Sequence, residues 1–585
     1  MKKRILALIL VCLMLASALA GCGGGAGDDT TFTWWIYSGA NSSYYIDYQE
    51  NPAIQYTLRN TYGPEDKKVA FEFWVPAPGK EADNYSTMLV SNDLPDIIDA
   101  VICDPAPVMV EKGYALDITE YVERNMPNYV ALVHSNETYR KNAVFMVDGK
   151  EHYYSLVNIM DAPEDVFQGF QYRRDWIVKY GANPQTGAAF TGGFTDANDP
   201  DAWTDDVVFP SGGSDPLYIS DWEWMFEIFE KAMADLGIND SYCMSLYYPG
   251  FTWSGGLLSC FGGGVNLWYQ DENGKVQFGG DGKYFRAYLE CMHSWYEKGW
   301  LDQDFYQRTS DAFYQIDDTS VRQGKVGMFN GEQSKLGGRM DMNDGGYTEG
   351  IYVVGAPYPI NDIYGDADCQ GKAPNCVMGG TLVSGGVLIT PSAKDKDLDT
   401  LCAYLDQFYA EEGALLKNLG LNAEQVAEFS DNNFYADYGL EDGAYFINDE
   451  GKYEKAPAIA QDSGGLAVAS AFTKAPGLQL EKNVDLGLSD NFQHSLDQWS
   501  KYPNTAFFQG TITTNMMIAE DTQTVAEIQS RALEYMTNNA VKFITGEKDI
   551  KSDADWDTWC KALKKYNYEK ANAIFQPYVD QYPFN

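Results

Sequence analysis

Three short apolar segments near the N-terminus alternate with segments of helical periodicity, and this alternation strongly limits the folds open to the chain. Residues 32–37 (FTWWIY), 69–74 (VAFEFW) and 96–101 (DIIDAV) have the pattern of β-strands. The segments between them, residues 44–62 and 84–91, are predicted to be helical. Strands and helices in this order are typical of a parallel, doubly wound α/β sheet.

The carboxyl ends of these strands are where a ligand is expected, because open α/β sheets bind ligands beyond that edge. This rule places Trp35, Tyr37, Trp74 and Asp99 near a cleft. Since side chains alternate along a strand, Trp34 and Trp35 cannot both face it.

Chain length and net charge further limit the number of lobes and the kinds of binding partner that can be expected. The chain has 585 residues, more than one core usually serves, so two lobes are expected. It carries 84 acidic against 42 basic residues, and the resulting net charge of −42 repels nucleic acid and anionic membrane surfaces. A strongly anionic solute is also disfavoured, although a local basic pocket could override the global field.

The N-terminus indicates export and lipid anchoring. Three basic residues at positions 2–4 precede an apolar segment that is too short to span a bilayer, as in a secretory signal peptide. Residues 19–22 (LAGC) resemble the lipobox of bacterial lipoproteins, in which Cys22 becomes the acylated, for example palmitoylated, first residue. We therefore predict a signal peptide over residues 1–21, a flexible tether over residues 22–30, and attachment to the extracellular face of the membrane. The alternative is an ordinary cleaved signal peptide with a chance cysteine.

Metal and thiol chemistry are not favoured. The cysteines beyond Cys22 have no CxxC spacing and the four histidines are scattered, so neither zinc, a Cys–His nucleophile nor a cofactor is expected. Cys369 and Cys376 are the pair to test for a disulfide. Residues 196–201 (DANDPD) are similar to a calcium loop, but Pro200 and the missing glycine and terminal glutamate break the EF-hand pattern. Calcium binding at this segment is left open, and no metal ligands are assigned.

Aromatic side chains are the most informative part of the composition. The chain has 14 Trp, 41 Tyr and 29 Phe, and their flat faces suit pyranose rings, although most must lie in the core. Residues 247–269 are rich in glycine and carry Trp253 and Trp268, as in a loop that brings rings to a ligand. In contrast, Ser220 and Glu223 have the spacing of a capping box, which opens an amphipathic helix and places Trp222 in the core. Residues 181–216 lack apolar periodicity and are expected to form a surface insertion.

Six segments, spread in order over nearly the whole mature chain, have sequences of one known family. They are DLPDII at 93–98, ALDITEYVERNMPNY at 115–129, YRRDW at 172–176, GKVGMFNG at 324–331, LITPSAKDKDLDTLCAYLDQFYAEEG at 388–413 and VKFITGEKDIKSDADWDTWCKALKKY at 541–566. Through these segments the chain resembles the extracellular solute-binding lipoproteins of carbohydrate ABC importers, in particular the large sugar-binding type of Gram-positive bacteria.

The resemblance implies a two-lobed α/β fold of the periplasmic-binding-protein type (type II), with the ligand in a cleft between the lobes. On this pattern lobe one comprises residues 31–160 plus 388–500, and lobe two comprises residues 161–387 plus 501–585. Such a protein acts as a monomer that captures a sugar or oligosaccharide and delivers it to an ABC transporter permease. Closure of the lobes on the ligand creates the surface that the permease reads.

Eight residues are candidates for contact with this ligand. Aromatic rings would stack on sugar rings, whereas Arg173, Asn330 and Glu332 would hydrogen-bond to hydroxyl groups. Arg173 could instead pair with Asp175, and Asn330 could be a turn residue. The candidates are Trp35, Tyr37 and Trp74 from lobe one and Arg173, Trp253, Trp268, Asn330 and Glu332 from lobe two.

Two other functions stay open. A secreted glycoside hydrolase would also be acidic and rich in aromatic residues, and it needs two carboxylates roughly 5 to 9.5 Å apart across a cleft. No motif singles out such a pair among the 84 acidic residues. The same binding fold could also serve a peptide or an anionic sugar, for which Arg173 is the one basic residue expected in the cleft.

Overall fold

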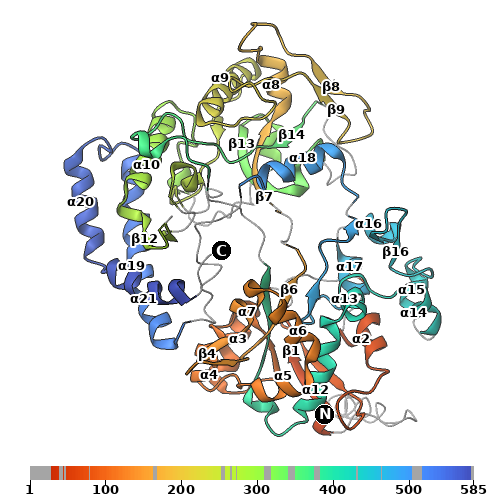
Figure 1. Ribbon diagram of the computed structural model, residues 1–585. Coiled ribbons are helices and arrows are strands. Elements are labelled where there is room, and N and C mark those ends of the chain that lie inside the picture. The colour runs from red at the N-terminus through yellow and green to blue at the C-terminus, as the bar shows by residue number, and fades with distance from the viewer. Residues whose placement is uncertain are drawn as a thin grey trace, which may run out of the picture.

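The protein is a mixed α/β molecule with two lobes, each built around its own sheet (Figure 1). The computed structural model describes residues 28–37, 44, 48–77, 79–162, 166, 168–251, 257–263, 267–271, 273–307, 318–339, 350–374, 382–429, 433–462, 464–485, 487–502 and 517–581. Within this part of the chain no helix has both the length and the apolar character needed to span a bilayer.

The sheet of the first lobe has six strands in the order β18-β6-β15-β3-β1-β2. The predicted N-terminal strands are confirmed, and β1 pairs in parallel with both β2 and β3. The next strand, β15, runs antiparallel between β3 and β6, and β18 pairs with β6 in parallel. The strands are β1 (Thr31–Trp35), β2 (Ala70–Trp74), β3 (Ile97–Asp99), β6 (Leu156–Met160), β15 (Val383–Ile389) and β18 (Leu478–Gln479).

Both faces of this sheet are covered, as a doubly wound fold requires. Trp34 and Trp35 alternate between the two faces and belong to separate apolar clusters. The cluster around Trp35 includes Tyr85, Met88 and Met109, which come from α3 and α4. The helices of this lobe are α2 (Pro52–Thr57), α3 (Glu81–Ser91), α4 (Ala106–Glu111), α5 (Thr119–Asn125), α6 (Pro127–Ser135), α7 (Glu137–Ala143), α12 (Leu398–Asp406), α13 (Glu411–Leu419), α14 (Ala423–Glu428), α15 (Asn433–Asp437), α16 (Pro457–Ala460) and α17 (Gly465–Ser470).

The sheet of the second lobe has four strands in the order β10-β13-β7-β14. They are β7 (Gln168–Arg173), β10 (Tyr242–Met244), β13 (Val326–Glu332) and β14 (Val353–Gly355). The largest apolar cluster of the molecule packs here, and it includes the predicted core residue Trp222, which is wholly buried. The helices around it are α8 (Arg174–Tyr180), α9 (Ile219–Leu236), α10 (Lys283–Glu297), α11 (Asp318–Arg322), α18 (Asp490–Trp499), α19 (Ala519–Ile544), α20 (Asp553–Lys564) and α21 (Tyr568–Gln581).

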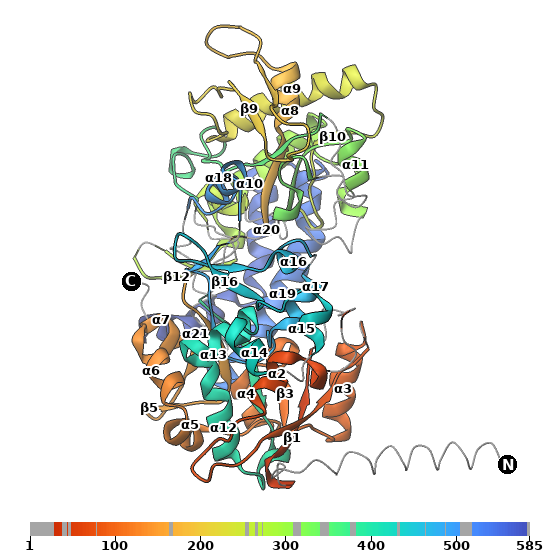
Figure 2. The ribbon, with the colours of Figure 1, turned by 90° about the vertical axis from the view of Figure 1, so that its right-hand side faces the viewer.

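Three connections join the lobes, and all three involve neighbouring strands of the first sheet. The chain passes from β6 to β7, returns from β14 to β15, and passes again from β18 to α18. β15 begins at Val383, inside the range assigned to the second lobe from the sequence. α18 lies in the range assigned to the first lobe, but it packs on β7 and β14 of the second. On another side of the molecule α19 contacts α4, so the lobes also meet away from these connections (Figures 1 and 2).

Smaller sheets complete the fold. Two hairpins, β4 with β5 and β11 with β12, are antiparallel, whereas β17 pairs with β16 and β19 on its two sides. Their bounds are β4 (Phe145–Val147), β5 (Lys150–His152), β11 (Trp268–Gln270), β12 (Val276–Phe278), β16 (Tyr445–Ile447), β17 (Tyr453–Lys455) and β19 (Val484–Asp485).

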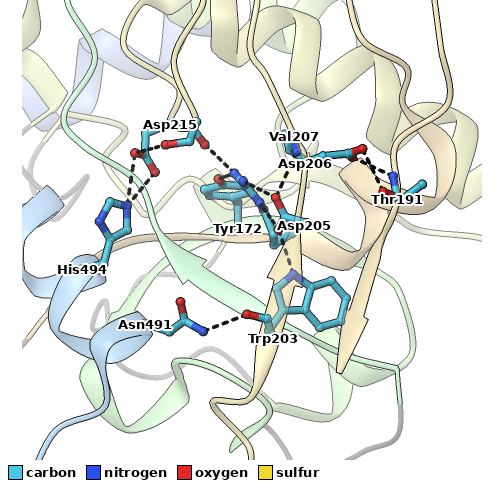
Figure 3. Close-up of polar contacts among 11 residues, drawn as sticks. Tyr172, Thr191, Trp203, Asp205, Asp206, Val207, Asp215, Asn491 and His494 are labelled. Atoms are coloured by element: carbon cyan, nitrogen blue, oxygen red, sulfur yellow. Dashed lines mark hydrogen bonds and ion pairs between the residues drawn. The ribbon is translucent and has the colours of Figure 1, made fainter. Parts of the chain in front are cut away.

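The insertion at residues 181–216 forms the hairpin of β8 (Gly192–Phe194) and β9 (Trp203–Asp205), which is fastened to the second lobe by polar contacts (Figure 3). Asp205 accepts two hydrogen bonds from the buried guanidinium of Arg174, at 2.9 and 2.7 Å. α18 holds the insertion from the other side, since Asn491 donates to the backbone oxygen of Trp203. His494 also reaches both carboxylate oxygens of Asp215, at 3.1 and 3.2 Å.

The start of α9 differs from the predicted capping box. The carboxylate of Asp221 accepts hydrogen bonds from the backbone amides of Leu217 and Tyr218, at 2.9 and 3.0 Å, and thereby caps the helix. Ser220 lies inside the helix and binds the carboxylate of Asp362. The predicted capping box was wrong, because Ser220 is bound by the distant carboxylate of Asp362. Asp221, one residue later, caps the helix instead.

Candidate functional site

The carboxyl ends of β1 and β3 meet at a buried carboxylate. Asp99, the last residue of β3, accepts hydrogen bonds from the backbone amide of Tyr37 at 2.8 Å and from the indole of Trp34 at 3.2 Å. Burial raises the pKa of Asp99 to about 7, and these hydrogen bonds oppose the rise. The segment that leaves β1 is therefore fixed against β3, and it holds Tyr37 half-buried at this edge of the sheet.

A cavity of about 330 Å³ lies beside this edge, next to the strands that connect the lobes. Its lining includes the segment after β3, the beginning of β15 and polar side chains of Asn142 and Ser155, which are both buried. The complete lining is Ala100, Cys103, Asp104, Pro105, Ala106, Asn142, Ser155, Val157, Val383, Ser384, Gly385 and Leu388.

A larger cavity of about 820 Å³ lies between the lobes, where α4 of the first lobe faces α19 and α21 of the second. It shares Asp104 and Pro105 with the smaller cavity, so the two form neighbouring compartments along the first lobe. Val525 and Phe575 supply buried apolar surface, whereas Glu520 is exposed. An apolar lining with polar groups around it is typical of sites for small organic ligands.

The second lobe contributes a row of polar residues at the end of its sheet. Glu332 pairs with Gln168 across β13 and β7, and Asn330 lies two residues before Glu332. Because paired residues share a face and alternate residues along a strand share a face, these three side chains lie on the same side of the sheet. β7 begins directly after the connection from the first lobe, so this end of the sheet is next to the junction (Figure 1).

Asn330 is the most unusual of these residues. Its side chain is 1% exposed, yet neither its amide oxygen nor its amide nitrogen has a hydrogen-bond partner. The amide oxygen of Gln168, which is 2% exposed, also has none. A buried polar atom without a partner costs about 1–3 kcal/mol, so native proteins keep such atoms where a ligand or water satisfies them.

Two predicted tryptophans occupy different environments. Trp35 is wholly buried against Tyr85, and its indole donates to the amide oxygen of Asn84 at 2.7 Å, so its ring is part of the core of the first lobe. Trp268 is 5% exposed and packs on Phe278, but its indole nitrogen has no hydrogen-bond partner.

The other aromatic candidates are less enclosed or lie outside the described residues. Trp74 ends β2 and is half-buried next to the cluster around Trp35. Tyr37 lies at the neighbouring strand end, with its ring 6.4 Å from that of Trp35. Trp253 and the predicted acylation site Cys22 both lie outside the described residues.

Arg173 does not face the row formed by Gln168, Asn330 and Glu332. It lies at an odd position of β7 whereas Phe170, the partner of Asn330, lies at an even one, so the two side chains point to opposite faces. The guanidinium of Arg173 is held by Asp175 and by the backbone oxygen of Val321. The alternative given by the sequence, a pair with Asp175, is what the structure contains.

The sequence analysis did not select Gln168 or the residues around the larger cavity as candidates for ligand contact. Gln168 is the first residue of β7, and a strand that begins right after an interlobe connection is a signal that could have pointed to it. The larger cavity combines residues from α4 with residues of α19 and α21, which are far apart in the chain. Nothing in either segment alone indicates that they face each other.

The acidic segment at residues 196–201 is held by an arginine of the second lobe. Both carboxylate oxygens of Asp201 are bound by the guanidinium of Arg339, which crosses from the loop after β13. Across the described residues there is no group of three or more histidine, cysteine, aspartate or glutamate side chains arranged to hold a metal ion. Cys369 is a buried free thiol, and Cys376 lies outside the described residues.

Neither a protein-family model nor a curated protein matches the chain. Solved structures do match it in fold. An extracellular solute-binding protein from Bifidobacterium longum subsp. infantis is similar over 96% of this chain and 99% of its own, with a TM-score of 0.66 and 15% sequence identity. The S. pneumoniae ABC-transporter substrate binding protein FusA in complex with kestose is similar over 94% and 99%, with a TM-score of 0.62 and 18% identity.

A third solved structure, the alginate-binding protein AlgQ2 without calcium ion, is similar over 95% of this chain and 99% of its own, with a TM-score of 0.61 and 15% identity. In all three cases the similarity covers nearly the whole of both chains. The chain therefore has the two-lobed α/β fold of the solute-binding proteins of ABC transporters.

Proposed function

We propose that the protein is an extracellular solute-binding protein that captures a sugar or oligosaccharide between its lobes and delivers it to an ABC importer permease. The fold supports this function, because two of the similar solved structures are described as an ABC-transporter substrate binding protein in complex with kestose and as an alginate-binding protein. Proteins of this architecture close on a ligand that contacts both lobes, since only differential affinity for the closed state can drive closure.

The observation that carries the proposal is the buried, unpaired amide of Asn330 at the lobe junction. An amide presents both donors and an acceptor, the combination that a sugar hydroxyl can satisfy in either direction. Gln168, in the same row, offers a second unpaired acceptor. Both residues lie at the end of the second sheet that is next to the connection between the lobes, while Tyr37 follows β1 and Trp74 ends β2 in the opposite lobe. We infer that the ligand meets polar groups from one lobe and aromatic groups from the other.

The proposal includes a lipid anchor and a monomeric state. The lipobox-like residues 19–22 and the glycine-rich tether support attachment through Cys22 to the extracellular face of the cell membrane. Several acyl chains on one cysteine suffice for stable anchoring, because each buried methylene contributes about 0.8 kcal/mol. A single ligand site between two lobes of one chain requires no second subunit.

We also propose that the protein binds its ligand without chemical change. The similar solved structures are titled as binding proteins. The buried Asp99, whose pKa of about 7 would suit a general acid, has both carboxylate oxygens engaged by Trp34 and Tyr37 within the first lobe. A glycosidase would need a second carboxylate across the ligand.

The test is a thermal-shift and calorimetry screen of residues 28–585 against neutral oligosaccharides, uronate oligomers and peptides, with glycan analysis of the medium. One intact glycan should raise the melting temperature in proportion to the logarithm of its concentration. Asn330→Ala should weaken binding by about tenfold or more, whereas Asn60→Ala, at an exposed turn of the first lobe, should not. Stabilisation by peptides alone, or cleavage of the glycan, would overturn the proposal.

A further inference from the structure

The cavity between α4 and α19 has two walls that belong to different lobes. Pro105 and Val108 line it from the segment after β3, while Val525 and Ala526 line it from the opposite side, on α19. At about 820 Å³ it falls in the range of natural ligand sites and exceeds the space that a single sugar ring needs. A molecule in this cavity contacts both lobes, and it therefore favours the state in which α19 lies against α4.

The ionisable residues around this cavity are mostly acidic. Asp104, Glu111 and Glu520 line it together with one basic residue, Lys112. The ammonium group of Lys112 lies 2.7 Å from the carboxylate of Asp104, so these two charges offset each other and Glu111 and Glu520 leave the lining negative. The field inside the cavity consequently opposes a carboxylate or sulfate group, whereas neutral hydroxyl groups can donate to the acidic oxygens.

Two buried arginines of the second lobe are occupied by ion pairs within that lobe. The buried guanidinium groups of Arg173 and Arg174 are each held by two contacts to an aspartate, Asp175 and Asp205 respectively. These two charges are therefore not available to an acidic sugar.

We propose that the α4–α19 cavity is an extension compartment, which receives the outer units of an uncharged oligosaccharide whose first unit lies near Asn330. The proposal rests on the proposed function, and it adds a ligand class: neutral glycans of several units, with uronate oligomers excluded. Apolar faces of the outer sugar rings pack on Val108, Val525 and Phe575, and hydroxyl groups bond to Glu520 and to the amides of Gln523 and Gln529.

The first experiment measures affinity by calorimetry for neutral oligosaccharides of one to six units and for uronate oligomers of the same lengths. Affinity for the neutral series should rise by about tenfold or more once the chain is long enough to enter the cavity, and uronate oligomers should bind at least about tenfold more weakly. Equal affinity across lengths, or equal affinity for uronates, would overturn the extension compartment.

The second experiment fills the cavity. Ala526→Trp should weaken binding of the long neutral oligosaccharides by about tenfold and leave the shortest binding member unchanged, because only the long chains reach α19. The control is Arg531→Trp, an exposed position on the other side of α19 that does not line the cavity. If Ala526→Trp binds long oligosaccharides as tightly as the unaltered protein does, the extension compartment is refuted and the proposed function stands. If the unaltered protein binds no sugar, the proposed function itself is refuted.

A third variant tests the charge argument. Glu520→Lys introduces a cation at an exposed position of the lining, where it should improve the affinity for uronate oligomers relative to neutral ones. The change in preference should shrink as salt is added, since exposed charges are screened beyond about 10 Å at 0.1 M salt. An unchanged preference would show that the acidic lining does not select the ligand.

Discussion

Arg173 and Asp175, two residues apart at the junction of β7 and α8, form a two-point ion pair in which Nε lies 2.8 Å from Oδ1 and Nη2 lies 2.5 Å from Oδ2. Both side chains are at least nine-tenths buried. The same carboxylate accepts a hydrogen bond from the backbone amide of Tyr352 at 3.1 Å, so the pair also ties α8 to the segment before β14. Arg173 is thereby a structural residue of the second lobe in this conformation.

Arg173→Ala should lower the free energy of unfolding by about 3–5 kcal/mol, because it leaves the buried Asp175 carboxylate without its counter-charge. Urea denaturation measures this loss. Lys80→Ala is the matched control, since the pair of Lys80 with Asp83 is exposed and should contribute no more than about 1 kcal/mol. A variant of Arg173 that keeps its stability but loses glycan affinity would instead make Arg173 a ligand contact.

Asn330→Leu should raise the stability of the ligand-free protein by about 1 kcal/mol or more, because it removes two buried polar atoms that have no partner. The same variant should lose glycan binding, which separates the two roles of the site. Denaturation with and without ligand gives both quantities. A lower stability of Asn330→Leu in the ligand-free protein would show that the amide has a structural partner.

His494 and Asp215 make the attachment of the insertion sensitive to pH. The hydrogen bond that His494 donates to the carboxylate of Asp215 is the main cause that raises the pKa of His494 above 6.5; Asp497 adds to the rise, and burial and Arg174 oppose it. Burial also opposes the ionisation of Asp215, but His494 and Arg174 hold its pKa below 3.8. A raised histidine pKa stabilises the fold in full below pH 6.5, and this contribution is lost as the pH rises through the pKa of the folded state.

Unfolding measured at several pH values should therefore show that the unaltered protein loses stability relative to His494→Gln as the pH rises above 6.5. Because His494 is about half exposed, salt should weaken the effect. If the free energies of unfolding of the two proteins change in parallel across this pH range, the His494–Asp215 pair does not make the stability depend on pH.

Calcium should not stabilise the protein through residues 196–201. Arg339 already supplies the positive charge at Asp201, while Asp199 accepts a hydrogen bond from the backbone amide of Asp201 at 2.8 Å. We expect the melting temperature to be the same with calcium and with a chelator, because a ligand stabilises only by binding the folded state. A calcium-dependent increase that Asp201→Asn abolishes would establish a site here.

Cys22→Ser should release the protein from the membrane, since it removes the proposed acylated residue while it leaves the signal peptide in place. Fractionation of cells that express either form would locate it, with glycan binding of the released domain as the check that it is folded. Retention of the serine variant in the membrane fraction would indicate another means of attachment.

The strands and long helices were predictable because their apolar periodicity is local. Segments 69–74 and 96–101 form β2 and β3. The apolar spacing of residues 521–545 also predicts a helix, and α19 occupies this segment. The spacing of residues 393–412 predicts one helix as well, but the structure is less regular there: α12 ends at Asp406, a 3-10 turn follows, and α13 begins at Glu411. Asp406 binds the backbone amides of Asn128 and Tyr129 in α6, a long-range contact that periodicity does not reveal.

The candidate site was less predictable, for reasons that individual residues show. Arg173 has a partner two residues away, and spacing alone does not distinguish such a partner from a ligand. The importance of Asn330 depends on hydrogen bonds that its amide does not make, which only the packed structure reveals. Trp35 is aromatic and ends a strand, but Tyr85 and Asn84 of α3 enclose it.

The position of β15 has a consequence for how the chain is made. This strand, at residues 383–389, lies between β3 and β6, which are both complete by residue 160. The N-terminal segment alone therefore leaves the edges of both strands unpaired until the sheet of the second lobe, which ends with β14 at residue 355, has been synthesised. Pairings at such long sequence separation form slowly, and open strand edges favour aggregation. We expect the chain to depend on chaperones while it is synthesised, with the two lobes maturing together rather than in order of synthesis.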